Sequence, residues 1–201
     1  MLIIDRIVWF INSAISIIIV AVIVLMIVRL IADAMDLNPF AWTSRTIRRL
    51  SDGFIIPTRG GLRGAGVDTK FAPLVVILIV ILLGYFVIQL VTAVAAMLVG
   101  IILSARSGAV FRIIGFIISG LISIYILLIV IRTVFSWGGI SYTNRLMRFL
   151  VDVTEPLLGP LRRTIPRLGW IDISPLVAIL ILWLFQQAVA GTLLSGPFRS
   201  F

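Results

Sequence analysis

The chain contains no cysteine and no histidine among its 201 residues. Without cysteine there is no disulfide, no thiolate nucleophile, no iron–sulfur ligation and no prenyl or palmitoyl attachment. Without histidine the chain lacks the commonest metal and haem ligand and the side chain that titrates near neutral pH. We therefore expect no metal site, no cofactor and no catalytic residues in this chain by itself.

Charge is also scarce, since charged residues make up 12% of the chain and hydrophobic residues 61%. Most apolar residues gather in four runs that contain no charged side chain, and each is long enough to cross a hydrocarbon core of roughly 30 Å. The runs are Ile7–Val28, Ala72–Leu98 (Leu103 at its longest), Ile113–Ile131 and Ser174–Leu194. The composition predicts an all-α membrane protein with four transmembrane helices.

The first run could instead belong to a secretory signal peptide, because Ala32-Asp33-Ala34 resembles a cleavage site. The run is longer than a signal peptide needs, and only Arg6 supplies a basic residue before it. We interpret it as a membrane span.

The order of residues around these runs occurs twice, about 100 positions apart. The first copy contains Arg29, Arg45, Arg48, Leu50, Asp52, Pro57, Asp68 and Pro73, and the second contains Arg132, Arg145, Arg148, Leu150, Asp152, Pro156, Asp172 and Pro175. Such self-similarity predicts two tandem helix–amphipathic connector–helix repeats, residues 1–103 and 104–201. We expect both in parallel orientation, related by a twofold axis along the membrane normal.

The net charge of +9 comes from 16 arginines and one lysine against 8 acidic residues. The bases concentrate in two connectors, Leu37–Phe71 and Ser136–Ile173, beside the ends of the spans. Because cytoplasmic loops carry the excess of Lys and Arg, we expect both connectors in the cytoplasm and both termini outside. The placement favours membrane lipids over nucleic acid as the partner of these charges.

Each connector is predicted to form an amphipathic helix in the headgroup layer, with its basic side outward. In the second connector, Thr143 or Asn144 should cap the helix, and the expected inward residues are Leu146, Phe149, Leu150 and Val153. A separate short helix should start at Thr154-Glu155-Pro156, and Ser174 should cap the last span. In the first connector the expected inward residues are Ile47, Leu50 and Phe54.

A charged cluster is predicted at the cytoplasmic edge, where Arg132 ends an apolar run. An arginine at this depth either reaches lipid phosphate or pairs with an acid. We expect it to pair with Asp172 or Glu155, mirrored in the first copy by Arg29 with Asp33 or Asp68. A structural clamp is the favoured role. The alternatives are a substrate or ion site, and lipid-phosphate or partner binding by Arg145, Arg148, Arg162 and Arg163.

The second connector carries four short elements in a fixed order: Thr154-Glu155-Pro156, Pro160-Leu161-Arg162-Arg163, Ile165-Pro166 and Asp172-Ile173-Ser174-Pro175. With this order, the chain resembles the YggT (also called YlmG) family of small bacterial and plastid membrane proteins over about Ile131–Leu184. The first copy is more divergent, although Arg29, Asn38-Pro39 and Asp68 remain.

The resemblance implies a non-enzymatic assembly or organisation factor of the bacterial cytoplasmic (inner) membrane. The implied processes are cell division, osmotic stress tolerance and the biogenesis of membrane complexes such as cytochromes. The implied partners are anionic lipid headgroups and an unidentified membrane or cytoplasmic protein, with a homo-oligomer possible. The alternative function is a small oligomeric channel or transporter for ions or osmolytes.

Overall fold

The computed structural model describes residues 2–35, 42–64, 68–137, 144–165 and 172–194. These residues form helices joined by short segments, and no strand occurs among them. The α-helices are α1 (Leu2–Ala34), α2 (Trp42–Gly64), α3 (Ala72–Arg106), α4 (Val110–Trp137), α5 (Arg145–Thr164) and α6 (Ser174–Val189). A 3₁₀ turn, η1 (Thr69–Phe71), precedes α3, and a π-helical turn, η2 (Ala190–Leu194), follows α6.

Four of these helices are long and apolar enough to cross a membrane. They comprise Ile3–Asp33, Thr69–Arg106, Val110–Trp137 and Ser174–Leu194, so all four predicted spans are confirmed as helices of spanning length and composition. Most of their side chains are not buried within the protein, as expected for helices whose apolar surface is covered by lipid.

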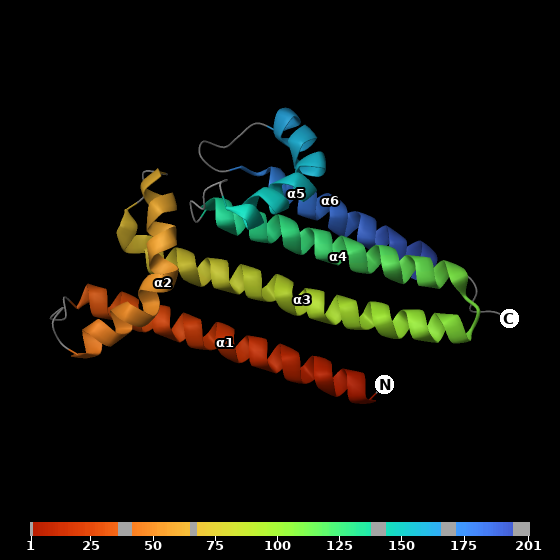
Figure 1. Ribbon diagram of the computed structural model, residues 1–201, viewed down its shortest axis with the longest axis horizontal. Helices are drawn as coiled ribbons and strands as arrows, with labels where there is room; N and C mark the ends of the chain where they lie inside the picture. Colours follow the sequence, from red (N-terminus) through yellow and green to blue (C-terminus); the bar gives the residue numbers. More distant parts are fainter. Residues whose placement is uncertain (1, 36–41, 65–67, 138–143, 166–171, 195–201) are drawn as a thin grey trace.

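The spans lie side by side in the order α1, α3, α4, α6 (Figure 1). Among the described residues α1 makes no contact with α6. A twofold axis that superimposes α1 on α4 and α3 on α6 also superimposes α4 on α1 and α6 on α3. The α3–α4 contact would then require an equivalent contact between α6 and α1. The expected twofold relation is therefore wrong. The short turn Ser107–Ala109 keeps α3 beside α4, and the row stays open beyond α1 and α6.

The connector helices α2 and α5 cross the same end of the row, where α1 and α4 end and α3 and α6 begin (Figure 1). α2 packs on α1 and α3, and α5 packs on α4 and α6. The opposite end holds the start of α1, the turn between α3 and α4, and η2. Long basic connectors and short turns are thus separated to opposite ends of the molecule.

The buried faces of the connectors agree only in part with the predicted ones. In α5 the buried residues are Met147, Leu150, Thr154 and Leu158, and in α2 they include Ser51, Ile55, Thr58 and Leu62. Of the expected inward residues, Leu150 is buried as predicted, whereas Leu50, Phe54, Leu146 and Phe149 are exposed. A helix between protein and lipid has two apolar surroundings, so apolarity alone does not identify the protein side.

Two expected helix boundaries are also wrong. α5 is one helix, with Pro156 and Pro160 inside it and a bend visible in Figure 1, rather than two helices. Asn144 caps α5 as predicted, accepting a hydrogen bond from the Leu146 backbone N–H at 2.9 Å. Ser174 does not cap α6, because it is the first helical residue and its own N–H donates to Asp172 Oδ1 at 2.9 Å.

Glycines set how closely neighbouring spans approach. Gly84 lies against Ile19 at the α1–α3 contact, and Gly100 lies against the ring of Phe116 at the α3–α4 contact. A side chain at Gly100 would occupy the space of a rigid aromatic ring, so this helix pair depends on the missing Cβ.

We expect Gly100→Leu to lower the free energy of unfolding by about 1–3 kcal/mol, because overpacking forces α3 and α4 apart. Thermal unfolding in detergent measures this change. Gly191→Ala is the control, since nothing lies within 4 Å of the position its Cβ would take. Adding Phe116→Ala to Gly100→Leu should recover part of the loss, and no recovery would contradict the assigned contact.

Candidate functional site

Arg132 lies at the connector end of α4 with only 4% of its surface exposed. Its Nη1 donates to Thr154 Oγ1 at 2.7 Å, and its Nη2 donates to Glu155 Oε2 at 2.6 Å. A buried guanidinium is tolerated only when paired and hydrogen-bonded, and both partners lie on α5. The contact therefore fixes the middle of α5 on α4.

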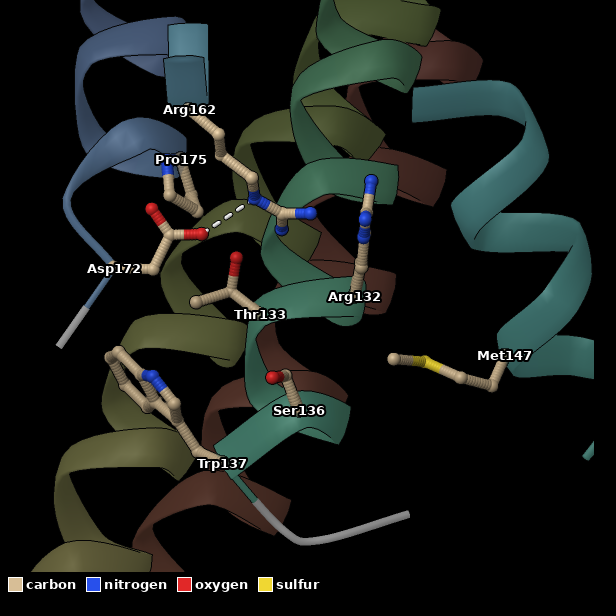
Figure 2. Close-up of a pocket in the computed structure, with 8 residues that line it drawn as sticks. All are labelled: Arg132, Thr133, Ser136, Trp137, Met147, Arg162, Asp172 and Pro175. Carbon is tan, nitrogen blue, oxygen red and sulfur yellow. Dashed lines mark hydrogen bonds and ion pairs between the residues drawn. The ribbon is translucent and has the colours of Figure 1, made fainter. Parts of the chain in front are cut away.

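A second arginine extends this contact to α6. Arg162 Nη1 lies 3.4 Å from Glu155 Oε2. Arg162 Nε donates to Asp172 Oδ2 at 2.7 Å, the contact that Figure 2 marks with a dashed line. The other Asp172 oxygen accepts the Ser174 N–H at the start of α6. Arg132, Glu155, Arg162 and Asp172 thus form one charged chain that joins α4, α5 and α6, which we call the α5 clamp.

A small pocket of about 30 Å³ borders the α5 clamp. Figure 2 shows its lining, which consists of Arg132, Thr133, Ser136, Trp137, Met147, Arg162, Asp172 and Pro175. Small-molecule sites usually measure about 300–1,000 Å³, so this space suits a few waters or a small ion. Among the described residues no group of three or more acidic side chains could hold a metal ion.

The first half of the chain contains a corresponding arginine. Arg29 is 3% exposed; its Nε donates to Asp33 Oδ2 at 2.8 Å, and its Nη1 donates to Ser51 Oγ at 3.0 Å. The same Nη1 lies 3.5 Å from Asp52 Oδ1, and Arg48 Nη2 lies 3.5 Å from Asp33 Oδ1. We call this group, which joins α1 to α2, the α2 clamp.

The two clamps share a spacing in sequence. Each arginine meets a hydroxyl residue 22 positions later and an acid 23 positions later. Each hydroxyl donates to the carbonyl four residues before it, Ser51 to Ile47 and Thr154 to Leu150. By contact Asp52 therefore corresponds to Glu155, whereas the repeated sequence order had matched it to Asp152.

Two acids were predicted as alternative partners for each buried arginine, and in each case one of the two contacts it. Arg132 meets Glu155, and Asp172 binds Arg162 instead. Arg29 meets Asp33, whereas Asp68 caps η1 through the Lys70 N–H and lies 4.0 Å from Lys70 Nζ.

The basic residues expected to face lipid or partners fall into two groups. Arg145, Arg148 and Arg163 are exposed, whereas the Arg162 side chain is 27% exposed and belongs to the α5 clamp. Sequence reasoning also missed the hydroxyls of Ser51 and Thr154. Their common distance from Arg29 and Arg132 was the available signal.

The pKa of Asp172 is lowered in the folded protein. Burial raises the pKa, but hydrogen bonds from Ser174 and Arg162, together with the charge of Arg162, outweigh it. A lowered carboxyl pKa stabilises the fold above the unfolded value near 3.9, and this contribution is lost as pH falls through the folded value.

We expect Glu155→Gln to lower the free energy of unfolding by about 1–3 kcal/mol, because it leaves the buried Arg132 charge without its acid. Asp152→Asn is the control, since Asp152 lies exposed on the same helix. Thermal unfolding in detergent compares them, and equal losses would contradict the clamp.

We expect Asp172→Asn to reduce stability at pH 7 and to make the loss of stability between about pH 5 and pH 3 shallower than in wild type. Thermal unfolding measured across this pH range tests it. Asp152→Asn should keep the wild-type slope, and an unchanged slope in Asp172→Asn would contradict the assignment.

The α5 clamp lies in the part of the chain that matches a known protein family. Residues 111–193 match the CCB3/YggT family. The protein named "Uncharacterized protein YggT" of Escherichia coli (strain K12) is 37% identical over 74 residues, which are 37% of this chain and 39% of that protein. "Uncharacterized protein in proC 3'region" of Vibrio alginolyticus is 31% identical over 86 residues, covering 43% and 46% of the two chains.

An uncharacterized protein of Pseudomonas aeruginosa is 43% identical over 67 residues, covering 33% of this chain and 34% of its own. The matches thus span less than half of these relatives, and no solved structure matches the chain. The family region contains Arg132, Glu155, Arg162 and Asp172. The resemblance found in the sequence is confirmed over residues 111–193, which match the CCB3/YggT family.

Proposed function

We propose that the chain is a tandem duplication of one unit, residues 1–103 and 104–201, each a span, an amphipathic connector and a second span. The support is the common spacing of the two clamps. A second support is that the two halves pack alike. Met26 and Ile55 are fully buried in the first half, and Ile129 and Leu158 are fully buried in the second. The function proposed below uses the second unit, where the family match lies.

We infer that both connectors face the cytoplasm and both termini face outward in a bacterial cytoplasmic membrane. Support comes from the distribution of charge, because exposed Arg145, Arg148 and Arg163 lie at the connector end of the row. Basic side chains at a membrane surface attract anionic headgroups. Anionic lipids are accordingly one proposed partner.

The proposed function is that of a non-enzymatic assembly or organisation factor in the cell envelope. The observation that carries it is the burial of Arg132 against Thr154 and Glu155, which holds α5 rigidly on the bundle. A rigid helix loses little conformational entropy on binding, so its outer face is suited to recognise a protein. Binding at a fixed surface needs no catalytic group.

The outer face of α5 combines charge with apolar surface. Arg145 and Arg148 alternate with Leu146 and Phe149 in its first two turns, and all four side chains are exposed. Arginine and aromatic side chains are enriched where proteins bind one another. We propose that this face binds an acidic protein surface at the headgroup layer, in cell division, osmotic stress tolerance or the biogenesis of a membrane complex.

The test is crosslinking and co-purification from native membranes of wild type and of Arg148→Glu/Arg163→Glu. We expect a defined protein partner to be recovered with wild type and reduced at least roughly tenfold in the variant, because like charges across an interface are strongly unfavourable. Arg162 is left intact, since its reversal would break the α5 clamp.

Arg106→Glu is the matched control, because it reverses an exposed arginine at the opposite end of the row. Recovery of the same partner by both variants would overturn the proposed surface. Anionic lipid alone, together with ion flux in reconstituted vesicles, would replace the assembly role by the channel or transporter alternative.

A further inference from the structure

The α3–α4 contact joins the two proposed units, and the residues that the structure describes form no second contact of this kind. α3 is the second span of the first unit and α4 the first span of the second, so the units meet head to tail. Within the described part of the chain, the corresponding helices at the ends of the row, α6 and α1, are each packed by a single span. In a head-to-tail contact two different surfaces meet, so one surface of each kind remains without a partner, here on α6 and on α1.

The register of the α3–α4 contact follows from two close approaches. Phe116 lies against Gly100, and Met97 lies against Gly120, so the helices are antiparallel. Leu82 lies 18 residues before Gly100, and Val134 lies 18 residues after Phe116, which is five full turns in each helix. Leu82 and Val134 therefore oppose one another, and both pack against the apolar cluster formed by Ile122, Ile126 and Val130.

The same positions can be located on α6 and α1. Leu82 is nine residues after Pro73, and Leu184 is nine residues after Pro175, each proline being the second residue of its helix. Val134 is two residues after Arg132, and Ile31 is two residues after Arg29. Leu184 and Ile31 are thus the counterparts of the opposed pair.

The counterpart surfaces are apolar and uncovered. Leu184 is 54% exposed and Ile31 is 50% exposed, although the residues they match are partly buried at the α3–α4 contact. The neighbouring residues on each face are exposed as well: Leu180 and Ile181 on α6, and Ile17, Val20, Val24 and Val28 on α1. Both surfaces run along the helices as continuous apolar stripes.

We propose that α6 of one copy packs against α1 of a second copy and reproduces the α3–α4 contact between chains. Both copies then have the same membrane orientation, because α6 and α1 are antiparallel as α3 and α4 are. The connectors extend the contact: α2 reaches across to α4 within the chain, so α5 reaches α1 of the neighbour. The assembly is a head-to-tail homo-oligomer, a ring where the rotation closes.

The absence of cysteine makes the chain suitable for a crosslinking test. Two differently tagged full-length copies, Ile31→Cys and Leu184→Cys, are co-expressed and oxidised in native membranes. We expect a disulfide-linked dimer that contains both tags. Neither variant expressed alone should form a dimer, because the head-to-tail contact brings position 31 only to position 184.

Two controls make the result decisive. Leu82→Cys/Val134→Cys in one chain should form an intramolecular disulfide, which shows that the fold and the register are intact. Trp183→Cys replaces Leu184→Cys as the matched negative control, since residue 183 is also exposed but points about 100° away around the helix.

A dimer formed by either single variant would indicate a face-to-face contact and would overturn the proposal. If the intramolecular control forms its disulfide and no mixed dimer appears, both stripes face lipid, and this result would also overturn the proposal. The inference rests on the proposed duplication and not on the α5 surface. If the crosslinking test overturns the proposed oligomer, the co-purification result of Arg148→Glu/Arg163→Glu is unaffected. One proposal can therefore be wrong while the other holds.

Discussion

The architecture depends on two arginines buried at the ends of apolar helices. A guanidinium that is removed from water is strongly unfavourable until an acid and a hydrogen-bond acceptor reach it. Neither Arg29 nor Arg132 finds all of these groups on its own helix. The chain after each of them must therefore fold back, and α2 and α5 are placed across the row because they carry the missing partners.

Arginine suits this position better than lysine would, because its planar fork can donate in several directions at once. Arg132 uses two nitrogens for Thr154 and Glu155, and Arg29 divides its nitrogens among three side chains. The halves nevertheless differ. The α2 clamp draws on Asp33 of the same helix as Arg29, whereas the α5 clamp continues through Arg162 to the start of α6. The contacts of the α5 clamp consequently join three helices in the second half of the chain.

Composition was sufficient to predict the four spans and the helical class, because a run of some 20 apolar residues has few alternatives in water or lipid. The identity of the acid beside Arg132 was narrowed only to Glu155 or Asp172, since both lie near the same boundary. The length of α5 could not be derived, because a proline such as Pro156 usually begins a helix and here lies within one. The open row also escaped prediction, since a similar order of residues in the two halves of the chain does not fix the rotation between them.

The lengths of the spans have a consequence for the surrounding bilayer. The 35 residues of α3 extend about 50 Å, whereas the 21 residues of α6 and η2 extend about 32 Å. α1 has 33 residues, but its charge-free run Ile7–Val28 extends only about 33 Å. A hydrocarbon core of roughly 30 Å therefore matches the two outer spans, α1 and α6, and is shorter than the charge-free run of α3. Tilt or local thickening of the bilayer would absorb the hydrophobic mismatch at α3. A change in membrane thickness would thus act on the middle of the row more than on its edges.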